Sequence, residues 1–227
     1  MKAGILGKKL GMTQIFTDEG GFVPITVIEA GPCAVLKTGE GKALLGFDRK
    51  KEKNTTKPLL TMYKKLNVEP RAFVREIAFD SLEGISAGQE VTVDIFREKD
   101  FVDVTGVSKG KGFQGGVKRW HWKGGPGGHG SMHHRRVGSV GASSFPSRVL
   151  KGQRLPGRMG NKRNTIQSLE VLKIVKDKNI MLVKGSVPGA NNGYLEIRVA
   201  KKKEPAKREQ AVKPKETAKQ ESKQEKK

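Results

Sequence analysis

The chain has 227 residues, and its 45 lysines and arginines against 23 aspartates and glutamates give a formal net charge of +22. This balance argues against an ordinary acidic or neutral cytosolic enzyme and favours a polyanionic partner, either nucleic acid or an anionic membrane surface. The single cysteine, Cys33, cannot form an intramolecular disulfide, so a disulfide-stapled secreted protein is excluded and the reducing cytoplasm is expected. No apolar run approaches the roughly 20 residues that cross a bilayer, so we expect no membrane partner.

Residues 1–104 are almost neutral, with 16 basic and 15 acidic side chains, and predict strands and one helix. Strands are expected at 22–28 and 90–95, where apolar and β-branched residues alternate with polar ones between turn residues. A helix is expected to open at Thr55 or Thr56 and to stop at Asn67. Its apolar face has helical spacing and consists of Leu59, Met62, Tyr63 and Leu66.

Residues 105–165 differ sharply from the rest of the chain. They hold 13 basic residues and no acidic one, together with 15 of the 29 glycines, all four histidines and both tryptophans. Such a segment cannot build its own core, because fixing so many glycines costs more backbone entropy than its few apolar residues return. The missing carboxylates indicate an extended arm that lies against phosphates, which would repel each of them.

Residues 166–200 carry five basic and three acidic side chains and return to the strand pattern, with strands expected at 169–175, 180–183 and 194–199. Residues 201–227 carry eleven basic and five acidic side chains without a hydrophobic face, so they predict a disordered lysine-rich tail. The fold is therefore mostly β. A small closed barrel fits strands this short and evenly spaced better than a parallel α/β sheet.

Two patterns in the basic segment suggest a cofactor or a metal, and both fail in context. Residues 110–115 (GKGFQG) match the dinucleotide pattern G-x-G-x-x-G, but no amphipathic helix is expected after them and no acid follows to hold a ribose. The four histidines have no Cys, Asp or Glu beside them, and the surrounding cations would repel a metal. Without carboxylates the segment also has no general acid/base pair and no Asp to orient a histidine, so we expect no metal, no cofactor and no enzyme.

Residues 118–123 (KRWHWK) interleave cations with aromatic rings. Two interpretations stay open for Trp120 and Trp122: they stack on unpaired bases, which we favour, or they pin the loop to its own barrel. The cations of residues 135–163 recur every few positions and suit an arm that follows a phosphate backbone.

The candidate nucleic-acid contacts are the cations, histidines and aromatic side chains of this segment, one glutamine, and two lysines near the N-terminus. They are Lys8, Lys9, Lys109, Lys111, Phe113, Gln114, Lys118, Arg119, Trp120, His121, Trp122, Lys123, His129, His133, His134, Arg135, Arg136, Arg148, Lys151, Arg154, Arg158, Lys162 and Arg163. The tip of the loop has small residues whose backbone can press against RNA. It consists of Ser139, Gly141, Ala142, Ser143, Ser144, Phe145 and Pro146.

Four separate motifs resemble the bacterial family of large-subunit ribosomal protein three. They lie in the family's order at residues 4–13 (GILGKKLGMT), 106–115 (GVSKGKGFQG), 157–161 (GRMGN) and 183–189 (VKGSVPG), and the likeness covers residues 1 to about 200. The resemblance implies a six-stranded barrel of the translation-protein type, begun by residues 1–104 and completed by 166–200. It also implies a small inserted α+β piece near residues 45–80 and a long loop, 105–165, that penetrates rRNA.

The resemblance further implies direct binding near the 3′ end of 23S rRNA, an early role in large-subunit assembly, a loop tip near the peptidyl transferase centre, and contacts with neighbouring large-subunit proteins. No small-molecule substrate is implied. Some relatives carry a modified glutamine at the tip, where this chain has Ser144, so that modification is not expected. Two alternatives stay open: a nonspecific nucleic-acid chaperone or DNA-binding protein, and a cofactor-dependent enzyme.

Overall fold

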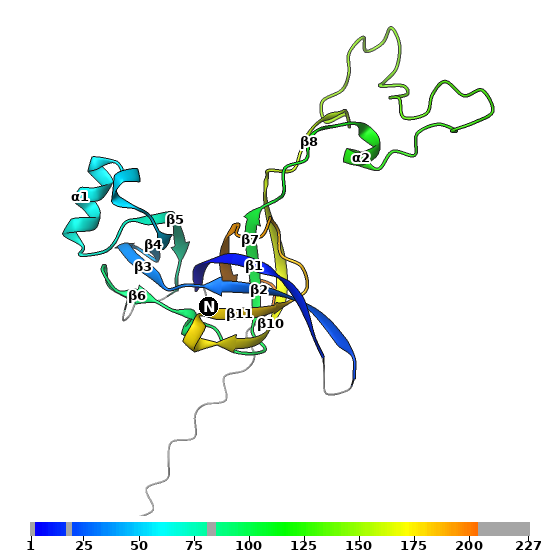
Figure 1. The fold of residues 1–227 in the computed structure, drawn as a ribbon. Helices are drawn as coiled ribbons and strands as arrows, with labels where there is room; N and C mark the ends of the chain where they lie inside the picture. The colour runs from blue at the N-terminus through cyan, green and yellow to red at the C-terminus, as the bar shows by residue number, and fades with distance from the viewer. Residues whose placement is uncertain (1–2, 17–19, 81–84, 204–227) are drawn as a thin grey trace, which may run out of the picture.

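A closed barrel of six strands lies at the centre of the molecule, as Figure 1 shows. The structure, a computed structural model, describes residues 3–16, 20–80 and 85–203. The barrel strands are β1 (Gly4–Phe16), β2 (Phe22–Ala30), β7 (Phe101–Val107), β10 (Arg163–Val175), β11 (Ile180–Lys184) and β12 (Tyr194–Val199). They run in the order β1-β12-β7-β10-β11-β2 with every neighbour antiparallel, which confirms the expected mostly β fold with a six-stranded barrel.

The barrel closes around side chains that alternate inward along each strand. Ile5, Ile28, Val104, Met181 and Ile197 each have no exposed surface, and each comes from a different strand. Branched apolar residues suit such a half-buried pleated surface, and closure leaves no unpaired strand edge around the core. The core therefore depends on strands from both ends of the chain.

A second sheet of four strands is inserted between β2 and β7, in the order β5-β4-β3-β6. Its elements are β3 (Cys33–Gly39), β4 (Lys42–Arg49), the 3-10 turn η1 (Glu52–Asn54), α1 (Lys57–Lys65), β5 (Arg71–Ala78) and β6 (Glu90–Val91). We expected the inserted piece near 45–80, whereas this sheet already begins at Cys33 and ends at Val91. The reason is that β4 needs β3 as its hydrogen-bonded neighbour, and β3 in turn needs β6.

The inserted sheet packs on the barrel through one continuous core, which joins Leu45 and Ile77 of the insert to Ile5 of β1. At its margin the Tyr194 ring of β12 stacks on Phe73 of β5, with ring centroids 4.8 Å apart. The Tyr194 hydroxyl donates to a carboxylate oxygen of Asp48 at 2.8 Å. Burial, together with this hydrogen bond, raises the pKa of Tyr194 above its usual value.

Most predicted elements are found, and one is corrected. The strands expected at 22–28, 169–175, 180–183 and 194–199 lie inside β2, β10, β11 and β12. The strand expected at 90–95 is wrong beyond Val91, because residues Val93–Ile95 form the 3-10 turn η2. The hydroxyl of Thr92 donates to Asp94 at 2.8 Å and supports this turn, while Val93 is fully buried.

The helix expected after Thr55 and Thr56 is present as α1, and Asn67 adopts φ +52° just after its end. Tyr63 is the buried anchor of this helix, but Leu59, one turn earlier on the same face, is 44% exposed. The predicted tail, residues 201–227, lies mainly outside the described residues. No helix in the described part of the chain has the length and apolarity of a membrane span.

Candidate nucleic-acid interface

Residues 108–162 leave the barrel between β7 and β10 and extend far from it (Figure 1). At the base, β7 and β10 are paired from Phe101↔Glu170 to Val107↔Arg163. The pairing continues past the barrel, since the Ser108 amide donates to Lys162 O at 2.9 Å and the Lys111 amide donates to Met159 O at 3.0 Å. Short strands β8 (Gly112–Gln114) and β9 (Gly157–Met159) then form a second ladder. We call residues 108–114 and 157–162 the stalk.

The two chains of the stalk cross closely at Gly160. A Cβ atom at this position would lie 2.0 Å from Lys109 O, and Gly160 has φ +74°. Both the missing side chain and the left-handed backbone require glycine. This explains why glycine stands within the 157–161 motif that the sequence singled out.

Beyond the stalk, the chain folds back on itself around the short helix α2 (Gly116–Trp120). Trp120 Nε1 and an Arg119 guanidinium nitrogen both donate to Leu155 O, at 2.8 and 2.6 Å. The Trp122 ring covers Gly116, where a Cβ atom would lie 1.9 Å from the ring. The two tryptophans thus close the loop on itself and do not pin it to the barrel, while stacking on unpaired bases stays a prediction.

Trp120 also organises the charge around it. The Arg119 guanidinium carbon lies 4.9 Å from the centroid of the Trp120 ring, and that of Arg154 lies 5.7 Å from it. Cation–π contact with one ring therefore holds together cations that are 35 positions apart in the sequence. The sequence predicted an alternation of cations and rings here, but not that both arms of the loop would meet on one ring.

The loop cations remain available to a partner. Arg119 is half-buried, and the other twelve are exposed: Lys109, Lys111, Lys118, Lys123, Arg135, Arg136, Arg148, Lys151, Arg154, Arg158, Lys162 and Arg163. Phe113 on β8 is also 77% exposed, directly across the ladder from Arg158, and Gln114 is half-buried beside it. Because no acidic residue lies anywhere in 105–165, nothing within the loop neutralises this charge. It can attract phosphates over its whole length.

The histidines lie in the outer half of the loop and hold its backbone. His134 O accepts the Gly125 amide at 2.6 Å, and His133 O accepts the Arg136 amide at 2.8 Å. His121 and His129 are exposed and have φ near +59° and +53°. Within the described residues, no three His, Cys, Asp or Glu side chains come together as a metal site would require.

A cavity of about 470 Å³ lies in this outer half and brings distant parts of the loop together. Its lining includes Trp122, His133, Arg136, Gln153 and Arg154. An aromatic ring, two guanidinium groups and an amide on one cavity are groups that can contact nucleotides through stacking, phosphate pairing and hydrogen bonds.

The predicted tip is an irregular excursion with little internal support. Ser139 Oγ donates to Gly141 O at 3.0 Å, and Ser147 Oγ donates to Ser144 O. Phe145 is 88% exposed, Pro146 is half-buried, and Ala142 and Ser143 are exposed. The tip thus presents small side chains and backbone on its surface, with one large ring.

Lys9 has a role that the sequence did not predict. It is only 6% exposed, and its ammonium group donates to Val187 O at 2.9 Å, while its amide and carbonyl bond to Gly193 and Asn192. Burial, and secondly the charge of Lys109, lower the pKa of Lys9. Because this ammonium is used inside the protein, we leave Lys9 out of the interface and keep Lys8, which is half-buried.

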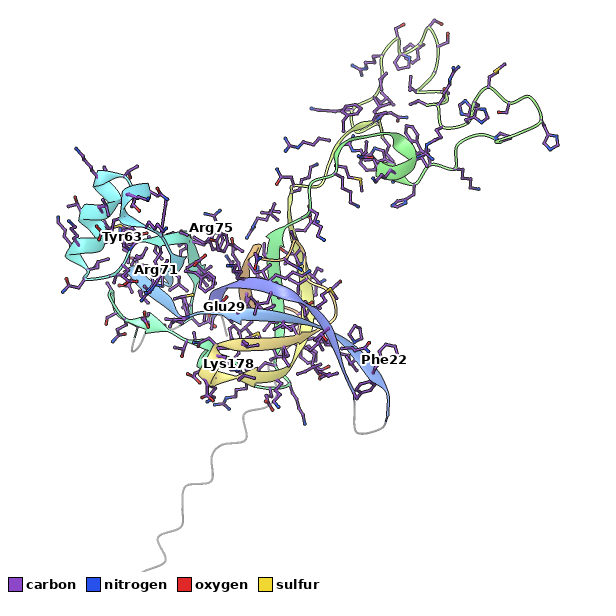
Figure 2. The ribbon with its side chains drawn as sticks, viewed as in Figure 1. Phe22, Glu29, Tyr63, Arg71, Arg75 and Lys178 are labelled. Carbon is purple, nitrogen blue, oxygen red and sulfur yellow. The ribbon has the colours of Figure 1, made fainter. Side chains whose placement is uncertain are left out.

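Three arginines converge on one carboxylate at the base of the loop, a cluster that the sequence did not reveal. Glu196 of β12 contacts Arg163 at 2.9 Å, Arg198 at 3.3 Å and Arg75 at 3.6 Å. Arg75, labelled in Figure 2, comes from the inserted sheet, and Arg163 comes from the first position of β10. Three cations on one anion leave a local surplus of positive charge beside the stalk. The only sign of this cluster in the sequence is the spacing of Glu196 and Arg198, which are two residues apart on one strand and so lie on the same face of the sheet.

Comparison with known proteins shows which chains this one is similar to. A family model described as Ribosomal protein L3 matches residues 73–181. A relative named large ribosomal subunit protein uL3, from Syntrophotalea carbinolica, is 49% identical over 209 residues, which cover 89% of this chain and 100% of the relative. Relatives of the same name from Carboxydothermus hydrogenoformans and Brachyspira pilosicoli are 49% and 44% identical, over 89% and 92% of this chain and 99% of each relative.

Proposed function

The chain belongs to the ribosomal protein L3 family, and from this premise we propose that residues 105–165 bind 23S rRNA directly while the barrel serves as their anchor. As a member of this family it is a structural constituent of the large ribosomal subunit, located in the cytoplasmic ribosome, and not an enzyme. Its partners there are rRNA and other ribosomal proteins. The expected family resemblance is thereby confirmed.

One observation carries the proposal of direct binding. The loop extends from the barrel on a paired stalk, exposes twelve of its thirteen cations and contains no acidic residue. A segment of this charge repels itself, so it gains most when phosphates surround it on several sides. The interior of a folded rRNA, where helices crowd together, is such an environment.

Three finer points belong to the same proposal. The protein binds near the 3′ end of 23S rRNA, acts early in assembly of the subunit, and places residues 139–146 near the peptidyl transferase centre. The family resemblance supports all three. The tip itself supports the last, because small residues and one exposed Phe145 can position RNA closely without adding phosphate affinity.

The test is binding of the protein to folded fragments from the 3′ region of 23S rRNA in an excess of competitor DNA, over a series of salt concentrations. If about eight loop cations displace counterions, the logarithm of affinity falls with the logarithm of salt at a slope of roughly −6 to −7. We expect the rRNA fragment to be retained against DNA. If competitor DNA displaced the rRNA fragment from the protein as readily as unlabelled rRNA does, the result would favour the alternative, a nonspecific nucleic-acid chaperone.

A second test separates the tip from the rest of the loop. We expect Ala142→Trp to leave incorporation into large subunits near normal and to change the rate of peptidyl transfer, since the tip holds RNA in position and binds little of it. Val149→Trp is the matched control, because Val149 is also exposed and the substitution adds the same ring outside the tip without removing a cation. If incorporation of the Ala142→Trp protein falls before the transfer rate changes, the tip is an assembly anchor and this part of the proposal is wrong.

A further inference from the structure

The β1–β2 hairpin extends beyond the barrel wall as a two-stranded ribbon (Figure 1). Pairing of β1 with β12 ends at Lys8↔Tyr194, and pairing of β2 with β11 ends at Ile25↔Lys184. Past these points, β2 is the only strand partner of residues 10–16 and β1 is the only strand partner of residues 22–24, with the ladder running from Gly11↔Val27 to Phe16↔Phe22. We call these two segments the outer hairpin.

The outer hairpin exposes large apolar side chains. Leu10 is 39% exposed, Met12 51%, Phe16 76% and Phe22 67%. Figure 2 shows Phe22 at the outer part of the hairpin, away from the barrel. An isolated two-stranded ribbon is marginally stable in water, and both of its strand edges are open to pairing. Exposed apolar surface of this kind marks a surface that another molecule covers.

The charge of the hairpin excludes RNA as that molecule. Residues 10–28 contain no lysine or arginine, in a chain that has 45, and their two charged residues are the acids Asp18 and Glu19. Surfaces that stack nucleic-acid bases on aromatic rings combine those rings with cations that hold the backbone. The outer hairpin has rings without cations, so a phosphate backbone gains nothing there.

Phe113 provides the contrast within the same chain. It is exposed to nearly the same degree as Phe16, 77% against 76%, but it lies between Lys111 in sequence and Arg158 across the ladder. Phe113 therefore stands in a cationic setting, whereas residues 10–28 around Phe16 contain no cation. The two settings select different partners.

We propose that the outer hairpin is a docking surface for another protein of the large subunit, one that offers a complementary apolar patch. The apolar patch covers Met12, Phe16 and Phe22. The inference rests on the proposed residence in the ribosome, and it goes beyond that proposal by assigning a protein partner to one hairpin and RNA to the other extension.

The experiment places a photo-crosslinking phenylalanine analogue at position 16, 22 or 113 in the full-length chain within intact large subunits. After irradiation, products are separated by their sensitivity to ribonuclease and to protease. We expect crosslinks from positions 16 and 22 to a protein, with ribonuclease leaving them intact, and crosslinks from position 113 to RNA. Positions 16 and 22 crosslinking to RNA, or to nothing while position 113 reacts, would overturn the docking surface.

The same experiment distinguishes failure of the inference from failure of the proposed function. If position 113 does not reach RNA in subunits that contain the protein, the proposed rRNA contact of the loop fails, whatever the hairpin does. A second variant, Phe16→Ser with Phe22→Ser, should keep its affinity for a free rRNA fragment within twofold and lose about tenfold in retention on subunits during a high-salt wash. Phe113→Ser should instead lose about tenfold in affinity for the free rRNA fragment and keep its retention on subunits within twofold.

Discussion

The barrel and the loop of residues 105–165 achieve order in opposite ways. The barrel is held from inside: Ile5, Ile28 and Ile197 have no exposed surface, and every strand has two neighbours in the closed sheet. Between residues 107 and 165 the only buried residue is Gly116, and it is covered by Trp122. The comparison teaches that one chain can carry a region stabilised by its own core and a region whose stability must come from its partner.

Charge follows the same division. On the barrel and the insert, cations meet acids, as in the contacts of Lys184 with Glu170 and of Arg71 with Glu90. Within the described residues, no ion pair involves residues 108–162. Surface ion pairs contribute little stability, so the pairing on the barrel mainly cancels its field, whereas the field of the loop is kept.

Excising the loop is the strongest way to test this division. Val107 and Arg163 are already cross-strand neighbours, so an Asn-Gly turn can replace residues 108–162 and remove twelve of the thirteen loop cations. We expect rRNA affinity to fall about a thousandfold and the salt slope to flatten towards zero, while the thermal unfolding midpoint stays within a few degrees. An unchanged slope would move the binding surface to the barrel or the tail.

Two leucines give the matching test of stability. Leu195 is 1% exposed in the barrel, and Leu150 is 60% exposed in the loop. Leu195→Ala should lower the free energy of unfolding by about 2–5 kcal/mol, because it leaves a cavity in the core. Leu150→Ala should change it by less than about 0.5 kcal/mol. Denaturant unfolding measures both, and equal losses would mean that the loop shares the core of the barrel.

Unfolding at alkaline pH tests the burial of Cys33, where β3 of the inserted sheet meets β1 of the barrel. Cys33 is fully buried, its thiol donates to Leu6 O at 3.3 Å, and burial raises its pKa to about 12 from a usual 9.0. The stability that this protonated thiol contributes is complete below pH 9 and is lost as pH rises towards 12, at about 1 kcal/mol per pH unit. Denaturant unfolding from pH 8 to 11 should therefore show a steeper alkaline loss than Cys33→Ala shows. Identical slopes would contradict the burial.

Adjacent glycines test the local order that the loop does possess. Gly116→Ala puts a methyl group where the Trp122 ring lies, whereas Gly115→Ala meets nothing within 4 Å. We expect Gly116→Ala to shift tryptophan fluorescence towards the spectrum of exposed indole and to weaken rRNA binding several-fold, with no change in unfolding free energy of the barrel. Gly115→Ala should match the unsubstituted protein in both measurements. Equal effects of the two would show that Trp122 does not depend on Gly116.

The sequence predicted the parts of the fold that follow a local pattern. Alternation located β12 at residues 194–199, and Asn67 located the end of α1, because strand and helix ends depend on neighbouring residues. It missed the start of the insert at Cys33, because a short apolar run is not distinctive without its partner strand. The composition of residues 105–165, with many glycines and cations and few apolar residues, predicted both an extended basic arm and the absence of a core there.

The site was predicted by residue type more successfully than by arrangement. Charge counting identified the exposed loop cations, since no acid in the segment can cover them. It could not find that Lys9 is buried against Val187, or that Arg75 joins Arg163 on Glu196, because these contacts cross 178 and 121 residues of chain respectively. Contacts of such separation are decided by the closed barrel and not by any local pattern.

The strand order also sets the sequence of events during synthesis. Because β12 lies between β1 and β7, the barrel cannot close until residues 194–199 have been made, and Gly4 then pairs with Arg198. Contacts this distant in the chain form slowly. The loop of residues 105–165 is thus synthesised before the barrel at its base has closed. A nascent chain therefore exposes its most cationic segment before the folded barrel can orient it.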